Sequence, residues 1–424
     1  MYKFFPPAVA VLFAGLAGLF SLPAQANYIL EKVVEVSRHG VRPPSPDNRR
    51  AIENGSARRW PAWQAEDGNL TGHGYTAAWL KGRYESDYYR QAGLLTKGCP
   101  GKQDFYLVAS PLQRTRATAQ ALAEAAFPGC GITAHSKATY DPLFQLPADK
   151  VSKAQAARHY QEALRAMGGS LSAAQRRLEP SINALKEAVC DPAQPCPAFS
   201  QPWQLAVWSN GTVGIQGLDT LAAMAETLRL EWSENKPLDE IAFGKVRKQA
   251  ELAALLPLLS AKYDYTNDLP GLARQGASRL MSQIAGALRA GTEGSSAEHA
   301  VDAPPDVRWL LYVAHDINIA WLRTMLDFNW QQADYPHGNI PPGSSLVFER
   351  WRDKDEHFIR IYFQAQSLDQ LRELTPLDGQ HPPLLTELTF PGCRKTPVGT
   401  LCPWHSAMQR IERHIMLSST ASAR

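Results

Sequence analysis

EKVVEVSRHGVRPP, residues 31–44, joins a hydrophobic run to a group of charged side chains. The valine-rich part at 33–36 is typical of a strand buried in a sheet. Arg38, His39 and Arg42 follow the strand directly. A buried strand that ends in a histidine flanked by two arginines presents an imidazole to an anion at the edge of a sheet. The alternative is a basic surface loop after a core strand, so the rest of the sequence has to separate the two interpretations.

Two other hydrophobic runs also end in polar residues. Residues 104–110 (DFYLVAS) precede Arg114, which opens an alanine-rich helix, and residues 307–314 (VRWLLYVA) precede His315 and Asp316. In an open α/β sheet, the carboxyl ends of parallel strands form the ligand crevice. If these strands are neighbours, three arginines, two histidines and one aspartate converge. Such a set of cations predicts a multiply charged anion, and phosphate fits because guanidinium groups bind its oxygens bidentately.

The composition is that of an ordinary globular protein of 424 residues. The 44 Lys and Arg against 41 Asp and Glu leave a formal charge of +3. We find no dense basic run interleaved with aromatic residues, so we expect no nucleic-acid partner. The length predicts one large domain or two moderate ones.

The N-terminal segment, residues 1–26, reads as a secretory signal peptide. Lys3 gives a positive start, residues 8–20 are apolar, and Ala24-Gln25-Ala26 provides a cleavage site before Asn27. The apolar run is shorter than the roughly 20 residues needed to span a bilayer. We therefore expect a periplasmic or secreted protein that has no membrane attachment after cleavage, and we expect it to be a monomer.

The cysteines agree with export. Their number is even, and several connectivities are open for six of them. We expect local pairs because each pair brackets one loop or helix-loop unit: Cys99–Cys130, Cys190–Cys196 and Cys393–Cys402. No Cys/His spacing typical of zinc appears, so we expect neither a metal nor a cofactor.

Between Gly131 and Pro305 the pattern changes to helical periodicity with few strand signals. This predicts an α/β domain built from residues 27–132 and 306–424, with a mostly helical insertion at 133–305. In the second α/β segment, residues 345–363 predict a hairpin. The helices expected in the insertion span residues 153–167, 172–188, 217–233, 243–260 and 271–288.

The converging residues also predict a reaction. A neutral His39 can attack phosphorus and form a covalent intermediate. The arginines and His315 would stabilise charge on the equatorial oxygens, and Asp316 is the candidate general acid for the leaving alkoxide. Two alternatives remain. A binding protein for phosphate or a sugar phosphate would need only the arginines, and a mutase is disfavoured by the export signal.

The sequence resembles the bacterial periplasmic histidine acid phosphatases, the group that contains the phytases and the glucose-1-phosphatases. The motif R-H-G-x-R-x-P at residues 38–43 and the His315-Asp316 pair carry the resemblance, which extends to residues 110–119, 141–144 and 341–351. It implies hydrolysis of phosphate monoesters such as phytate, a sugar phosphate or a broad range of esters.

The resemblance also implies a role for each matching residue and a fold. His39 would be the phosphorylated nucleophile and Asp316 the proton donor. Glu226 resembles a glutamate in the substrate pocket of the phytases. The implied fold is a central, mostly parallel sheet flanked by helices, like that of phosphoglycerate mutase, with a smaller helical domain over the cleft. The implied phosphate clamp consists of Arg38, Arg42, Arg114 and His315.

The chain departs from the phytase pattern beside both motifs. Ser45-Pro46 stands where a phytase commonly has Thr-Lys, which removes one cation that would meet a highly phosphorylated substrate. Ala314 replaces a usual glycine, and Ile317 replaces a usual Thr or Ser. These changes affect the expected substrate and leave the phosphate clamp intact.

Overall fold

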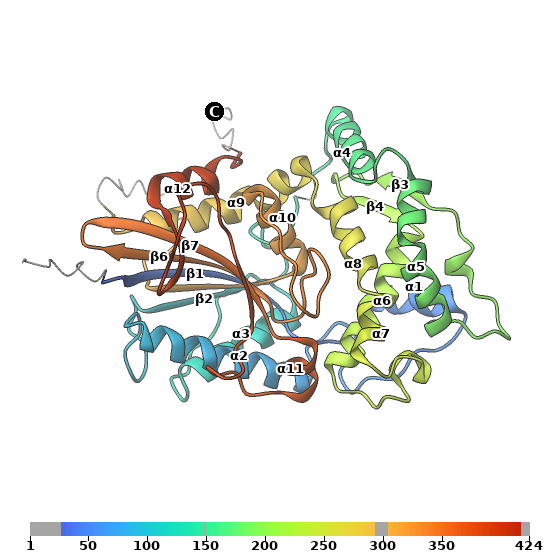
Figure 1. Cartoon of the computed structure of the whole chain (residues 1–424), viewed down its shortest axis with the longest axis horizontal. Coiled ribbons are helices and arrows are strands. Elements are labelled where there is room, and N and C mark those ends of the chain that lie inside the picture. Colours follow the sequence, from blue (N-terminus) through green and yellow to red (C-terminus); the bar gives the residue numbers. More distant parts are fainter. Residues whose placement is uncertain (1–26, 148, 293–303, 417–424) are drawn as a thin grey trace, which may run out of the picture.

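The computed structural model describes residues 27–147, 149–292 and 304–416, so the predicted signal peptide lies outside the described residues. A sheet covered by helices on both faces lies beside a mostly helical part (Figure 1). None of the helices in the described ranges has both the length and the apolar character that a bilayer span requires.

The central sheet has the strand order β2-β5-β1-β6-β7-β10-β9, and β8 pairs with β7. The three strands predicted from the charged motifs, β2, β5 and β1, run parallel. The prediction of a mostly parallel sheet therefore holds for this half and needs correction for the other half, where every pair from β1 to β9 is antiparallel. The strands are β1 (Ile29–Arg38), β2 (Phe105–Ala109), β5 (Trp309–Ala314), β6 (Ser345–Asp353), β7 (Glu356–Ala365), β8 (Leu384–Glu387), β9 (Arg394–Thr396) and β10 (Gly399–Pro403).

The register brings the ends of the three parallel strands to one level. Arg38 at the end of β1 lies opposite Ala314 at the end of β5. Val313 in turn lies opposite Ala109, the last residue of β2. The residues that follow the three strands therefore emerge at the same edge, as the sequence predicts.

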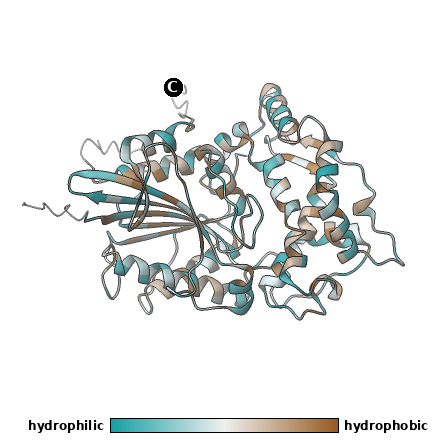
Figure 2. Ribbon diagram, viewed as in Figure 1, coloured by the Kyte–Doolittle hydropathy of each residue, from teal (hydrophilic) through white to brown (hydrophobic). Residues whose placement is uncertain are grey.

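Helices cover both faces of the sheet because successive strand residues point to opposite sides. Val33 packs with the face covered by α2 (Gly72–Gln91) and α3 (Gln113–Ala126), whereas Val34 and Val36 pack on the opposite side. Figure 2 shows hydrophobic and hydrophilic residues mixed along the covering helices, as expected for helices with one buried face. The helices of the opposite face are α9 (Pro270–Arg289), α10 (Asp316–Leu326) and α12 (Trp404–Glu412).

The helical part differs from its prediction in two places. A hairpin, β3–β4, occurs where few strands were expected. The single helix predicted at 243–260 is wrong. Phe243 and Gly244 have left-handed backbone conformations, so the first helix in this range begins only at Gln249, and a turn at residues 254–256 divides the range into two short helices. The elements of the helical part are α4 (Lys153–Ala166), α5 (Leu171–Val189), η1 (Pro197–Phe199), β3 (Gln204–Val207), β4 (Val213–Gln216), α6 (Leu218–Ser233), η2 (Ile241–Gly244), α7 (Gln249–Ala253), α8 (Pro257–Lys262) and the π-helix η3 (Tyr263–Asn267). One further short helix, α11 (Leu368–Glu373), follows β7.

A short helix, α1 (Pro46–Ser56), follows the loop after β1. The side chain of Ser45 caps it, and Pro46 suits its first position. It packs against α6, whereas α9 packs against α10 and β1. The division into an α/β domain of residues 27–132 and 306–424 and a helical insertion of residues 133–305 stays a prediction.

The three disulfides pair as predicted: Cys99–Cys130, Cys190–Cys196 and Cys393–Cys402. The first closes a loop with a sequence separation of 31. By the entropy of loop closure, a crosslink of this length contributes roughly 3–4 kcal/mol to the free energy of unfolding.

Candidate active site

The loop that follows β1 is held by backbone contacts on both sides. The N–H of His39 donates to the carbonyl of Ala314 at 3.1 Å, and the carbonyl of His39 accepts from the N–H of Gly343 at 3.0 Å. Gly40 allows close approach to α2, because a Cβ there would lie 2.9 Å from the carbonyl oxygen of Gly74. The backbone that carries the imidazole is therefore fixed by β5, by the loop before β6 and by the first turn of α2.

The imidazole of His39 is oriented for reaction at Nε2. Its Nδ1 lies 2.9 Å from the carbonyl oxygen of Gly40, so Nδ1 carries the proton and Nε2 keeps its lone pair. The residue is 1% exposed. Burial, followed by the charges of Arg114, Arg38 and Arg42, holds the pKa of His39 well below the usual value. A neutral imidazole with a free nitrogen is the form that can act as a nucleophile.

Three guanidinium groups surround this imidazole. In each, Nη1 donates a hydrogen bond to a backbone carbonyl: Arg38 to Ile340 at 2.5 Å, Arg42 to Pro43 at 2.7 Å, and Arg114 to Gly68 at 3.3 Å. The Nε atoms of all three are buried and have no hydrogen-bond partner among the described residues. Burial and the neighbouring arginines lower the pKa of Arg114 to about 10. Three guanidinium groups gathered around one imidazole favour the binding of an anion between them.

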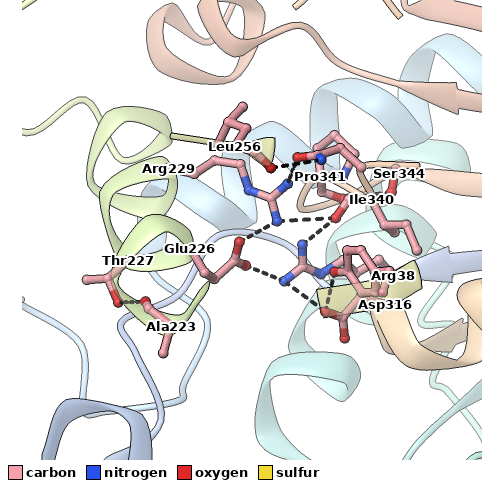
Figure 3. A network of polar contacts seen from close by, with 12 residues as sticks. Arg38, Ala223, Glu226, Thr227, Arg229, Leu256, Asp316, Ile340, Pro341 and Ser344 are labelled. Atoms are coloured by element: carbon pink, nitrogen blue, oxygen red, sulfur yellow. Dashed lines mark hydrogen bonds and ion pairs between the residues drawn. The ribbon is translucent and has the colours of Figure 1, made fainter. Parts of the chain in front are cut away.

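Glu226 lies at the site, and both of its carboxylate oxygens are already bound to arginines (Figure 3). Oε1 accepts from Nη2 of Arg38 at 2.6 Å, and Oε2 accepts from Arg229. Burial alone would raise the pKa of Glu226, but Arg229 and Arg38 outweigh it and lower the pKa. Arg229 also donates to the side chain of Asn339 at 3.2 Å. Glu226 thus connects α6 to the end of β1 and orients Arg38.

The second histidine follows β5 and contacts the end of β2. Nε2 of His315 lies 2.7 Å from Oγ of Ser110. The imidazole rings of His315 and His39 are 5.7 Å apart, centroid to centroid. Burial and the charge of Arg114 lower the pKa of His315 to about 3. Sequence reasoning placed Ser110 in a strand and missed this contact, since a single serine carries no distinguishing signal.

Asp316 completes the group at the N-terminus of α10. Its Oδ2 lies 3.9 Å from Nη2 of Arg38 and accepts a hydrogen bond from the hydroxyl of Tyr263 at 2.7 Å. Burial would raise the pKa of Asp316, but Arg38, the Tyr263 hydroxyl and Arg42 outweigh it and hold the pKa below the usual value. Tyr263 was missed because it lies in a π-helix distant in sequence from every motif.

The structure therefore gathers all seven residues singled out in the sequence at one edge of the sheet, while their individual roles remain proposals. Within residues 27–147, 149–292 and 304–416, no three His, Cys, Asp or Glu side chains are grouped as ligands for a metal ion.

Comparison with known proteins identifies the family. The histidine phosphatase superfamily (branch 2) matches residues 29–364. Phytase AppA of Escherichia coli K12 is 31% identical over 93% of this chain and 95% of its own length. Glucose-1-phosphatase of Salmonella typhimurium LT2 is 30% identical over 93% of this chain and 96% of its own length.

Among solved structures, the phytase of Klebsiella sp. ASR1 is 47% identical, with a TM-score of 0.85 over 92% of this chain and 97% of that one. The predicted enzyme class, a phosphoric monoester hydrolase of the histidine acid phosphatase type, is confirmed by these relatives. The chain belongs to the histidine phosphatase superfamily, branch 2.

Proposed function

We propose that this chain hydrolyses phosphate monoesters through a phosphohistidine intermediate on His39. One observation carries the proposal: a buried, neutral imidazole lies among three guanidinium groups whose Nε–H groups have no partner among the described residues. A phosphate group would offset the positive charge of these three arginines and bring phosphorus to the free Nε2. Arg38, Arg42, Arg114 and His315 then bind the phosphate oxygens, and Glu226 orients Arg38.

In the first step, Nε2 of His39 forms a bond to phosphorus while the bond from phosphorus to the ester oxygen breaks. The leaving alkoxide takes a proton from Asp316. Because Arg38, the Tyr263 hydroxyl and Arg42 hold the pKa of Asp316 below its usual value, the protonated form has to be produced when the ester binds. A phosphate monoester has a second pKa of about 6, so in acidic solution it brings a proton with it. Its negative charge also offsets the arginines that favour the carboxylate.

In the second step, Asp316 is a carboxylate and accepts a proton from water as the water oxygen attacks phosphorus. The bond from phosphorus to His39 breaks, and inorganic phosphate leaves with the imidazole restored. The arginines stabilise the charge on the equatorial oxygens in both steps, a stabilisation that usually provides the largest part of such catalysis.

For the substrate, we propose a range of esters that includes phytate and sugar phosphates, because relatives of both kinds cover nearly the whole chain. The Ser45-Pro46 sequence that caps α1 leaves this helix start without the lysine expected of a phytase. This favours a broad range over phytate alone. We also propose a periplasmic or secreted location and a monomer.

Rapid acid-free quenching of the enzyme with substrate, followed by mass spectrometry, tests the proposal. We expect one phosphate on His39 within the first turnover, release of inorganic phosphate from p-nitrophenyl phosphate, and little effect of EDTA. Rates on phytate, glucose 1-phosphate and aryl phosphates then rank the substrates. Tight phosphate binding without turnover would instead support a binding protein that uses the same arginines.

A further inference from the structure

The hydroxyl of Tyr263 holds the carboxyl group that is proposed to move the proton. It donates to Oδ2 of Asp316 at 2.7 Å, while Oδ1 accepts from the N–H of Ile317 at 3.0 Å. Each carboxylate oxygen therefore has one fixed donor. Tyr263 is 5% exposed, whereas the side chain of Asp316 is 34% exposed, so the hydroxyl is held inside the protein while the carboxyl group can still be reached by an ester.

A second contact region holds Tyr263 in place. Asp268, directly after η3, accepts from Nε of Arg323 at 3.1 Å and from Oγ1 of Thr324 at 2.8 Å. Both donors lie on α10, the helix that begins at Asp316. The guanidinium of Arg323 also lies 5.6 Å from the centre of the Tyr263 ring. Helix α10 thus provides the carboxyl group at its start and, about two turns later, fixes the segment that carries the hydroxyl.

We infer that Tyr263 is a positioning residue for proton transfer, which orients Oδ2 of Asp316 toward the leaving-group oxygen through the hydrogen bond between the two side chains. The inference rests on the proposed function. Tyrosine is suited to the role because its hydroxyl is a neutral donor that leaves the net charge of the site unchanged.

The groups that face this hydrogen bond are mostly cationic, and they come from β1 and its loop, from α6 and from the end of β5. They are Arg38, Arg42, His315, Glu226 and Arg229. Burial and the Asp316 carboxylate raise the pKa of Tyr263 well above its usual value, so the hydroxyl stays protonated throughout the working range. Because a donor to the carboxylate lowers the pKa of Asp316, its removal should raise that pKa.

The test is Y263F, with Y265F as its matched control. Tyr265 lies in the same π-helix and is also buried, and its hydroxyl accepts from Arg177 at 3.2 Å instead of contacting Asp316. The first-turnover rate is measured against pH at saturating glucose 1-phosphate and at saturating p-nitrophenyl phosphate. Under these conditions the alkaline limb reports the proton held in the enzyme–ester complex.

In Y263F we expect the alkaline limb to move upward by about one pH unit, as for loss of a hydrogen bond to a charged group. We expect the rate on glucose 1-phosphate to fall about tenfold, and the rate on p-nitrophenyl phosphate to change by less than about threefold, because nitrophenolate leaves without a proton. In an Asp316→Asn background the same substitution should leave the ratio of the two rates unchanged. Y265F should behave as the parent enzyme.

A Y263F enzyme whose pH limb and ester ratio coincide with those of Y265F would overturn the inference, as would a further change of ratio in the Asp316→Asn background. If Y263F does not fold, Thr324→Val, which removes one contact to Asp268, should give a smaller upward shift of the limb, and no shift would overturn the inference. Absence of turnover and of phosphohistidine in the parent enzyme would instead refute the proposed function.

Discussion

Two buried clusters of charged residues lie along strand β1, one with an excess of positive charge and the other with an excess of negative charge. At its end, the site cluster (Arg38, Arg42, Arg114, His39 and His315) has guanidinium N–H groups without partners among the described residues. Further back, Glu35 faces α2 and belongs to a second group, which we name the Lys81 cluster: Glu35, Ser37, Lys81, Glu85 and Ser345. The first cluster has surplus donors, and the second has surplus acceptors.

The Lys81 cluster is sealed in the core. Nζ of Lys81 lies 2.7 Å from Oε1 of Glu35 and 3.3 Å from Oε1 of Glu85. The second carboxylate oxygen of each glutamate has no hydrogen-bond partner in the part of the chain that the structure describes. Burial and the neighbouring Glu35 raise the pKa of Glu85 well above its usual value. The raised pKa favours the protonated form of Glu85, which would offset the excess negative charge.

The difference shows how a buried excess of charge is compensated in this protein. A sealed acidic cluster takes up a proton, because protonation is cheaper than a second buried carboxylate. Guanidinium groups lose protons far less readily, so the site cluster has to be compensated by an anion from solution. One strand thus carries a structural cluster and a binding cluster, and the following changes should separate them.

The largest effect is expected for His39→Ala. It removes the nucleophile and leaves the arginines in place, so turnover of p-nitrophenyl phosphate should fall roughly 10⁴-fold or more. Inorganic phosphate should still raise the midpoint of thermal unfolding, measured by calorimetry, because the clamp persists. Full activity of the purified variant would end the enzymatic interpretation.

Lys81→Met should destabilise the fold by about 3–5 kcal/mol, because it leaves two buried carboxyl groups without their cation. Urea unfolding followed by circular dichroism measures the loss. As a control, the triple variant Glu35→Gln, Lys81→Met, Glu85→Gln removes every charge and should recover much of it. A single variant as stable as the parent would contradict the assigned role of this cluster.

Arg114→Ala should lower kcat/KM by about 10²–10³-fold, the usual loss for one donor to a transition-state oxygen. Arg49→Ala is the matched control. Arg49 contacts Asp67, next to the Gly68 carbonyl that accepts from Arg114, but it is already paired with Asp67 at 2.6 Å and with Glu53 at 3.7 Å. It should change kcat/KM by less than about threefold. Equal losses in the two variants would mean that Arg114 does not bind the phosphate group.

We expect the enzyme to be most active in acidic solution. His39 remains neutral well below the usual histidine range because its pKa is lowered, so the nucleophile persists in acid. Above a pH of about 6 the free ester loses its proton, and Asp316 with its lowered pKa cannot replace it. A profile of kcat/KM against pH should therefore peak below neutrality, and a maximum above a pH of about 8 would refute this assignment.

The smallest effect is expected for Glu85→Gln. Because the folded pKa of Glu85 lies above the usual value of 4.5, the folded state retains a proton that the unfolded chain has lost. Stability of the parent should then fall as the pH rises from about 4.5 toward the raised value, and the glutamine variant should lack this slope. The change in thermal midpoint between pH 5 and pH 8 should therefore differ between the parent and the glutamine variant by roughly a few degrees. Parallel midpoints would argue against a proton on Glu85.

Much of the site was predictable because its residues directly follow strands. A run such as 307–314 is readable from hydrophobicity, and the residues after it must emerge at a sheet edge. Cysteine pairing over short separations was predictable for a similar reason, since chain connectivity limits the distance between the partners. The hairpin of β6 and β7 was predicted, but its antiparallel pairing with β1 and the division of the helix predicted at 243–260 were missed, because they depend on long-range pairing and on backbone conformations without a local signal.

The sequence alone determined which residues lie at the ends of β1, β2 and β5, since local periodicity decides where a strand stops. Only the tertiary structure decided what those residues contact. Glu226 is committed to Arg38 and Arg229, and Tyr263 reaches Asp316 from a separate π-helix. Hydrogen bonds between side chains 53 and 188 positions apart arise from packing. No pattern within one segment can encode such contacts, because both partners are positioned by the elements that pack around them.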